Sequence, residues 1–180
     1  MRILDIGAGT SNIAASMFSE MEGAEIVRLD IDPDTNPDIV SNATHLPDDC
    51  GMFDAMVASH VLEHMDRFDA LDALKSWYEH LMPRGKIWII VPDIYWAAEQ
   101  IVQESDSNIW FMAIFGASNR SEYLTHKSGY TVGVLRNFVS NAGFIVLEAR
   151  VAPLAIRIEG SDEAETAQQI LLVATRPEPL

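Results

Sequence analysis

The sequence contains one cysteine, Cys50, among 180 residues, so it cannot form an internal disulfide, and a reducing compartment is expected. Long apolar runs are also missing: none approaches the roughly 18 residues that a membrane-spanning helix requires, and the N-terminus has no signal-peptide pattern. Basic residues are scarce, with 12 Lys and Arg against 27 Asp and Glu. Because nucleic-acid binding depends on clustered Lys and Arg, we expect a cytoplasmic protein with neither a nucleic-acid nor a membrane partner.

The length and the order of elements favour a single α/β domain over residues 1–180. Apolar runs alternate with helical periodicity, which is typical of βαβ units and a mostly parallel, doubly wound sheet with helices on both faces. Strands are predicted over residues 1–7, 25–31, 38–43, 53–59 and 86–92, and helices over 11–21, 68–82, 94–104 and 131–143. Later apolar runs predict a C-terminal antiparallel hairpin. Residues 105–130 lack clear periodicity and are expected to form a functional insertion or lid.

A glycine-rich turn, LDIGAGTS, follows the first predicted strand at residues 4–11. Gly7 and Gly9 let backbone N–H groups approach a ligand at the start of the next helix without obstruction by a Cβ atom. A dinucleotide-binding fingerprint requires a further glycine three residues after Gly9, where this chain has Asn12. The turn therefore predicts a ligand site but disfavours an NAD-type pyrophosphate site.

An acidic residue, Asp30, ends the second predicted strand about 20 residues beyond the turn. A carboxylate in this place accepts hydrogen bonds from both ribose hydroxyls of a nucleoside, a contact of about 1.5–3 kcal/mol. Asp32 is the nearby alternative, and an exposed turn acid before Pro33 is the purely structural one. The spacing favours Asp30 as the ribose ligand.

The chain resembles the class I S-adenosylmethionine-dependent methyltransferases in five blocks, which follow the family's order and spacing over residues 1–93: LDIGAGTS, VRLDIDP, NATHLP, FDAMVASHVLEHM and LMPRGKIWIIVPD. The later GYTVGVLRNFVSNAGF is similar to a helix and strand of many such enzymes, and HKSGY resembles a piece of small bacterial members, of the methyltransferase type 11-like kind. The resemblance implies a Rossmann-like seven-stranded sheet, S-adenosylmethionine as cofactor, and methyl transfer to a small-molecule or glycan-type acceptor bound by residues 105–130.

The resemblance also implies a set of cofactor-binding residues, from the methionine end through the ribose and adenine to the sulfonium: Asp5, Gly7, Ala8, Gly9, Asp30, Ile31, Asn42, Ala43 and Ser59. Asn42 is a neutral amide where the family often has an acid that contacts the adenine amine, so binding there is expected to be weaker. Ser11 replaces a usual third glycine, and the helix that usually precedes the first strand is missing. These departures leave open a homodimer that closes the pocket, or a non-catalytic nucleoside-binding or scaffold subunit.

The segment SHVLEHM, residues 59–65, contains H-x-x-E-H, the spacing of a zinc-protease signature. A zinc site of that kind needs His60 and His64 on one helical face and a third ligand from a later helix. We instead expect His60 at the end of a strand, and V-L-E-H is similar to the helix start after the fourth strand of the methyltransferases. No metal site is expected, and Glu63 and His64 are interpreted as capping or packing groups.

Two histidines, His60 and His126, are predicted to be catalytic. Methyl transfer from a sulfonium depends on alignment and exclusion of water, and needs a general base only where the acceptor loses a proton. His60 would lie beside the methyl group, and His126 falls in the segment expected to cover the strand ends. A surface or packing role for His126 stays open. Further candidates for acceptor contacts are Arg120, Tyr123, Lys127 and Tyr130.

Overall fold

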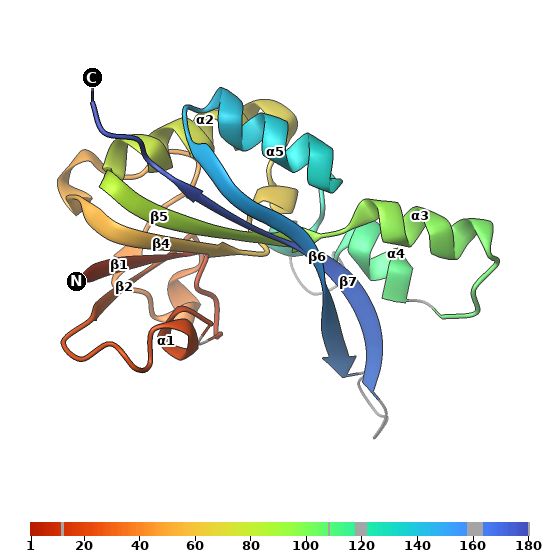
Figure 1. Ribbon diagram of the computed structural model, residues 1–180. Coiled ribbons are helices and arrows are strands. Elements are labelled where there is room, and N and C mark those ends of the chain that lie inside the picture. Colours follow the sequence, from red (N-terminus) through yellow and green to blue (C-terminus); the bar gives the residue numbers. More distant parts are fainter. Residues whose placement is uncertain (12, 108, 118–121, 158–163, 180) are drawn as a thin grey trace.

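The computed structural model describes residues 1–11, 13–107, 109–117, 122–157 and 164–179, whose strands form one seven-stranded sheet (Figure 1). The strand order is β3-β2-β1-β4-β5-β7-β6. The strands are β1 (Arg2–Ile6), β2 (Glu25–Asp30), β3 (Ile39–Val40), β4 (Phe53–Ser59), β5 (Leu81–Pro92), β6 (Ile145–Arg157) and β7 (Ala164–Thr175). This order confirms the predicted Rossmann-like, doubly wound architecture.

The sheet consists of a parallel part and a closing hairpin. β1 pairs in parallel with β2 and β4, and the pairs β2–β3 and β4–β5 are parallel too. β7 runs antiparallel between β5 and β6, as predicted for the C-terminal hairpin. β1 and β4 are buried along almost their whole length, as expected where helices cover both faces of a parallel sheet. β6 and β7 continue beyond the other strands as a twisted ribbon (Figure 1).

Helices cover both faces of the sheet (Figure 1). The α-helices are α1 (Ile13–Met17), α2 (Arg67–His80), α3 (Ile94–Val102), α4 (Ile109–Phe115) and α5 (Val132–Asn141), and the short 3-10 turns are η1 (Pro33–Thr35), η2 (Asp48–Cys50), η3 (Leu62–His64) and η4 (Glu122–Leu124). Leu74 and Trp77 of α2 and Leu135 of α5 belong to the main core, while Ala14 of α1 and Phe18 build a smaller core against the opposite face. No helix in the part of the chain that the structure describes is long and apolar enough to span a membrane.

Polar side chains fix the points at which three of the helices begin. Asp66, Asp93 and Thr131 each accept a hydrogen bond from a backbone N–H in the first turn of α2, α3 and α5, respectively. Such N-caps satisfy donors that have no partner within the helix. Asp93 follows β5 directly, so its cap fixes where the chain leaves the sheet.

Several elements differ from the sequence prediction. β3 covers only Ile39–Val40 rather than residues 38–43, and α2 ends at His80 rather than residue 82. β5 begins at Leu81 rather than residue 86, because Leu81 pairs with Phe53 before an irregularity in the register. The helix predicted over residues 11–21 is shorter in the structure, where α1 covers Ile13–Met17. α4 lies in the segment 105–130, for which no helix was predicted; its sequence IWFMAIF is apolar on every side and therefore shows no amphipathic periodicity.

Arg176, the residue after β7, ties the end of the chain to the end of α2. Its Nη1 donates to the backbone oxygens of Tyr78, Glu79 and Leu81 at 2.9, 2.9 and 2.7 Å, and its guanidinium lies over the Tyr78 ring, 4.7 Å from the centroid. These oxygens lie at the end of a helix, where carbonyl groups lack partners within the helix. We expect Arg176→Ala to lower the free energy of unfolding by about 2–3 kcal/mol, measured by urea denaturation.

Arg150→Ala is the matched control for this change. Arg150 forms an ion pair with Glu148 at 2.8 Å, but both side chains are more than half exposed. Exposed pairs contribute about 0–1 kcal/mol, so the control should lose far less stability. Equal losses in the two variants would contradict the anchoring role of Arg176.

Candidate functional site

The carboxyl ends of β1 and β4 lie side by side where the order of the strands reverses. Ligands bind outside such a reversal in open α/β sheets. A cavity of about 420 Å³, here called the central cavity, opens at this point. Its lining includes most of the residues that the sequence assigned to cofactor binding: Gly7, Gly9, Asp30, Ile31, Asn42 and Ala43.

The glycine turn after β1 forms one wall of the central cavity. Gly7 has φ 63°, and a Cβ atom there would lie 2.5 Å from Cγ2 of Val61. Gly9 has φ 52°, and a Cβ atom there would meet no atom within 4 Å among the described residues. Gly7 is therefore needed for packing inside the protein, whereas Gly9 leaves space on the side from which a ligand approaches.

Asp30 connects the turn to the end of β2. Its Oδ2 accepts a hydrogen bond from the Gly9 N–H at 2.7 Å, and its Oδ1 accepts one from the Asp32 N–H at 2.9 Å. The side chain of Asp32 instead accepts from the Asp34 N–H and so caps η1. Both residues line the central cavity, but the Asp30 carboxylate is fixed against the glycine turn, whereas the Asp32 carboxylate caps η1.

Arg28 also stabilises the glycine turn after β1, although it was not predicted from the sequence. Its Nη2 donates to the backbone oxygen of Gly9, while its Nε is buried without a partner among the described residues. Burial raises the pKa of Asp5 to about 6; the Arg28 charge opposes this rise and the Asp30 charge adds to it. Arg28 and Asp30 are two residues apart on β2 and so share a face, a spacing that could have indicated Arg28 in advance.

The other residues that the resemblance assigned to cofactor binding fall into two groups, one at the cavity wall and one in the core. Asn42 lines the central cavity, and its Oδ1 accepts a hydrogen bond from the Thr44 N–H at 2.9 Å. Asp5, Ala8 and Ser59 do not line the cavity. Asp5 and Ala8 are almost fully buried behind it, and the Ser59 Oγ is buried without a partner in the described part of the chain. Any effect of these three on a ligand is therefore indirect in this conformation.

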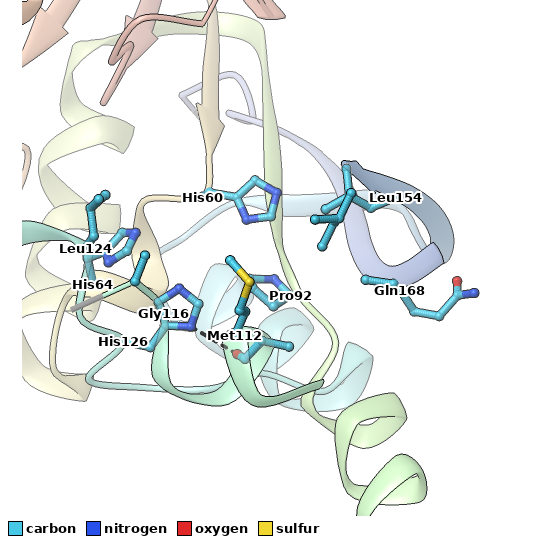
Figure 2. A pocket seen from close by; sticks show the side chains of 13 residues that line it. His60, His64, Pro92, Met112, Gly116, Leu124, His126, Leu154 and Gln168 are labelled. Atoms are coloured by element: carbon cyan, nitrogen blue, oxygen red, sulfur yellow. Dashed lines mark hydrogen bonds between the residues drawn. The ribbon is translucent and has the colours of Figure 1, made fainter. Parts of the chain in front are cut away.

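A second cavity, of about 230 Å³, shares lining residues with the central one. Figure 2 shows the side chains that line this second cavity. Its walls are mostly apolar and come from α4, β5, β6, β7 and the segment after η4; they include Pro92, Met112, Ala113, Leu154, Ile156 and Ala167. His60, His64 and Leu124 line both cavities. Tyr123 and Lys127 line the central cavity, Tyr130 is buried in the core, and Arg120 lies outside the described residues.

His60 stands where the two cavities meet. Its backbone adopts the left-handed region, with φ 56°, which turns the chain sharply after β4. Its Nδ1 lies 3.0 Å from Oε1 of Glu63, and its Nε2 lies 3.3 Å from Oε1 of Gln169. Burial by itself lowers the pKa of His60, but the hydrogen bond and charge of Glu63, together with Gln169, outweigh it, so the pKa is raised. These contacts fix the ring in one orientation.

The backbone of Glu63 binds the segment that follows His126 and so holds it beside the two cavities. Its backbone oxygen accepts hydrogen bonds from the N–H groups of Lys127 and Ser128 at 2.7 and 3.1 Å. As a result, the His126 ring lies 4.9 Å from the His64 ring, measured between centroids. Burial lowers the pKa of His126. The structure therefore brings together Glu63, His64 and His126, whereas His60 bonds to Oε1 of Glu63 and to Gln169.

The comparison with known families decides the class of protein. A family model described as a methyltransferase domain matches residues 1–149. The chain belongs to this methyltransferase domain family. Its membership confirms the resemblance seen in the sequence, and with it an enzyme dependent on S-adenosylmethionine. A search of curated proteins found no match for this methyltransferase.

Solved structures share the fold of this methyltransferase. A S-adenosylmethionine-dependent methyltransferase from Methanosarcina mazei is 17% identical, with TM-score 0.70 over 99% of this chain and 93% of that chain. A Haloferax volcanii methyltransferase in complex with an activator protein is 15% identical, with TM-score 0.69 over 98% and 83%. An N-methyltransferase of Bradyrhizobium japonicum in complex with S-adenosylhomocysteine is 12% identical, with TM-score 0.61 over 98% and 78%. Because these identities are low, the three matches show a shared fold and nothing about the ligands of this chain.

The raised pKa of Asp5 makes a prediction about stability. Folding lifts this pKa from 3.8 to about 6, so the folded protein retains a proton that the unfolded chain has lost, and stability falls as pH rises through this interval. We expect Asp5→Asn to raise the free energy of unfolding by about 1–3 kcal/mol at pH 7.5. The gain should fall to about 0.3 kcal/mol or less near pH 3.5, where the carboxyl group is protonated in the folded state and mostly protonated in the unfolded one.

Urea denaturation at the two pH values measures this effect. Asp72→Asn is a suitable control, because Asp72 is half exposed on α2 and pairs only with the exposed Lys75 in the described structure. The control should change stability by less than about 0.5 kcal/mol at either pH. A gain for Asp5→Asn that is the same at both pH values would show that its buried charge is not the cause.

Proposed function

We propose that this methyltransferase binds S-adenosylmethionine in the central cavity and transfers the methyl group to a small molecule in the second cavity. The observation that supports this most directly is the wall that both cavities share at His60, His64 and Leu124. A transfer between two bound molecules requires their reacting atoms in line and in contact. Adjoining cavities that meet at one strand end would allow such contact between a donor and an acceptor.

The central cavity fits a nucleoside bearing an amino acid. Its volume of about 420 Å³ lies within the range of small-molecule sites. Each Asp30 carboxylate oxygen already accepts one backbone N–H and retains capacity for a ribose hydroxyl. Gly9 lines the wall for close approach of the methionine end, and Asn42 lies where the adenine is expected. Asp5 would act from behind the turn through its negative charge.

The lining of the second cavity favours a small, partly apolar acceptor over a glycan. Most of the lining, including Met112, Leu154 and Ile156, offers no hydrogen-bonding side-chain group comparable to a hydroxyl or amide. The polar side chains of the lining are His60, His64, His126 and Gln168. A sugar carries hydroxyl groups on most of its faces, and burying them against such walls without partners is unfavourable. The segment 105–130 supplies Met112, Ala113 and His126 to this lining, which supports its proposed role as an acceptor-binding insertion.

The proposed catalytic contribution of the chain is alignment and exclusion of water. When bound, S-adenosylmethionine supplies a methyl group already activated by the sulfonium charge. His60, held by Glu63 and Gln169, lies at the junction and would contact both the donor and the acceptor. The apolar walls of the second cavity would keep water from the reacting atoms.

A direct test is calorimetry with S-adenosylmethionine and S-adenosylhomocysteine, followed by an assay of S-adenosylhomocysteine release. The assay would use a panel of small thiols, phenols, amines and carboxylic acids. We expect both cofactor forms to bind and at least one acceptor class to react. Binding without turnover across the panel would favour the alternative of a nucleoside-binding or scaffold subunit, and absence of binding would refute the proposal.

The ribose contact can be tested with a pair of variants. Asp30→Ala removes the proposed charge-assisted contact of about 1.5–3 kcal/mol, so we expect S-adenosylhomocysteine to bind at least about 10-fold more weakly. Asp32→Ala removes a nearby carboxylate that caps η1 and should change the affinity by less than about threefold. Calorimetry measures both, and circular dichroism checks that each variant is folded. Reversed effects would assign the ribose to Asp32.

The acceptor site can be tested by filling the second cavity. Ala113 lies on α4, half-buried, and lines only this cavity of the two. Ala113→Leu should raise the KM for the acceptor by about 10-fold or more, because the added carbon atoms occupy the space of the ligand. The affinity for S-adenosylhomocysteine should stay unchanged. An unchanged KM would place the acceptor elsewhere.

A further inference from the structure

We propose that Glu63, His64 and His126 form a binding site for one divalent transition-metal ion of the Zn²⁺ class, at the junction of the two cavities. Neither methyl transfer nor cofactor binding requires such a site, and the spacing H-x-x-E-H alone led us to expect none. The inference rests on where the folded chain brings these three side chains.

Potential ligand atoms of the three residues converge. One ring nitrogen of each histidine and one carboxylate oxygen of Glu63 all lie within 4.8 Å of one another. In the tetrahedral arrangement that zinc prefers, ligand atoms about 2.0–2.2 Å from the ion lie about 3.3–3.6 Å apart. The separations in the metal-free protein therefore exceed this arrangement by at most about 1.5 Å, and small side-chain rotations that bring the ligand atoms together by about an ångström would place all three on one ion.

The two histidines are oriented as metal ligands usually are. Nδ1 of His64 lies 3.2 Å from the backbone oxygen of Thr125, and Nδ1 of His126 lies 3.0 Å from that of Ala113. A ligating histidine typically donates its other ring N–H to a carbonyl or carboxylate, which fixes the tautomer and leaves a lone pair for the metal. Here both Nδ1 atoms would donate, so Nε2 of each ring carries that lone pair. Figure 2 shows both rings at the wall of the second cavity.

Glu63 supplies the independent observation that points to a ligand. Its side chain is 1% exposed. Oε1 bonds to His60, but Oε2 has no hydrogen-bond partner in the described part of the chain. A buried carboxylate oxygen without a partner is unfavourable, and a cation bound by Oε2, His64 and His126 would satisfy it.

The backbone holds the three residues in place without a metal. Glu63 and His64 both belong to η3, and the backbone oxygen of Glu63 accepts hydrogen bonds from the two residues that follow His126. The site therefore combines a short turn after β4 with a segment that is distant in sequence. This differs from the helical zinc site expected for H-x-x-E-H, because His126 takes the place that His60 would hold.

The donor set indicates the class of metal. Two imidazoles and one carboxylate suit Zn²⁺, Co²⁺, Ni²⁺ or Fe²⁺, whereas Mg²⁺ and Ca²⁺ prefer oxygen ligands. Three protein ligands also leave a coordination position open, as in catalytic zinc sites. If the proposed function holds, an acceptor in the second cavity could bind there through a thiol, hydroxyl or carboxylate. This consequence rests on the proposed function, but the metal site itself does not.

The test is titration of the chelator-treated full chain with Zn²⁺ by calorimetry, and with Co²⁺ by visible absorption. We expect one ion per chain and cobalt bands of the low-coordinate, nitrogen–oxygen type. Glu63→Gln, His64→Gln and His126→Gln should each weaken binding by at least about 10-fold. His45→Gln makes the same chemical change at an exposed histidine outside the cluster and should bind as the unaltered protein does.

The outcomes separate this proposal from the proposed function. If the unaltered protein takes up no ion, or if His64→Gln and His126→Gln bind as tightly as the His45→Gln control, the metal site is refuted. Calorimetry with S-adenosylhomocysteine on the same metal-free protein tests the cofactor site independently. Cofactor binding without zinc binding would overturn the metal site alone, and zinc binding without cofactor binding would overturn the proposed function alone. Circular dichroism and thermal melting verify that each variant is folded.

Discussion

The glycine turn after β1 depends on two bonds from β2, and the site depends on that turn. The Asp30 carboxylate holds the Gly9 N–H, and the Arg28 guanidinium holds the Gly9 oxygen. Together these contacts fix the turn beside the central cavity, at the reversal of strand order. Asp30, Arg28 and Asp5 therefore lie close enough for their charges to interact. Burial of the ionised Asp5 side chain opposes folding at pH values above its raised pKa. Groups that are unfavourable for stability in this way are typical of functional sites.

A second constraint comes from the left-handed residue His60 at the end of β4. The sharp turn directs Glu63 into the interior, where its backbone oxygen captures the segment after His126. These hydrogen bonds bring His126 to the wall of the second cavity, which shares His60 and His64 with the first. The same turn therefore links the proposed acceptor site, the proposed metal site and the wall of the central cavity.

The sequence could predict those features that arise from neighbouring residues. Apolar runs and helical periodicity predicted the alternating strands and helices over residues 1–104 and the closing hairpin, and the order β3-β2-β1-β4-β5-β7-β6 agrees with them. The spacing between the glycine turn and Asp30 likewise predicted that both would line one cavity. α4 escaped prediction, because a short helix that is apolar all round has no periodic signature.

What the sequence determined by itself is thus the class of fold and the end of the sheet at which the central cavity opens, because parallel strands bring their carboxyl ends to one edge whatever the details of packing. Only the tertiary structure decided which histidines meet. His60 and His64 share a motif, yet His64 pairs with His126 across the fold, while His60 turns to Glu63 and Gln169. The reason is physical: such contacts depend on backbone hydrogen bonds between segments distant along the chain, and no local pattern records these bonds.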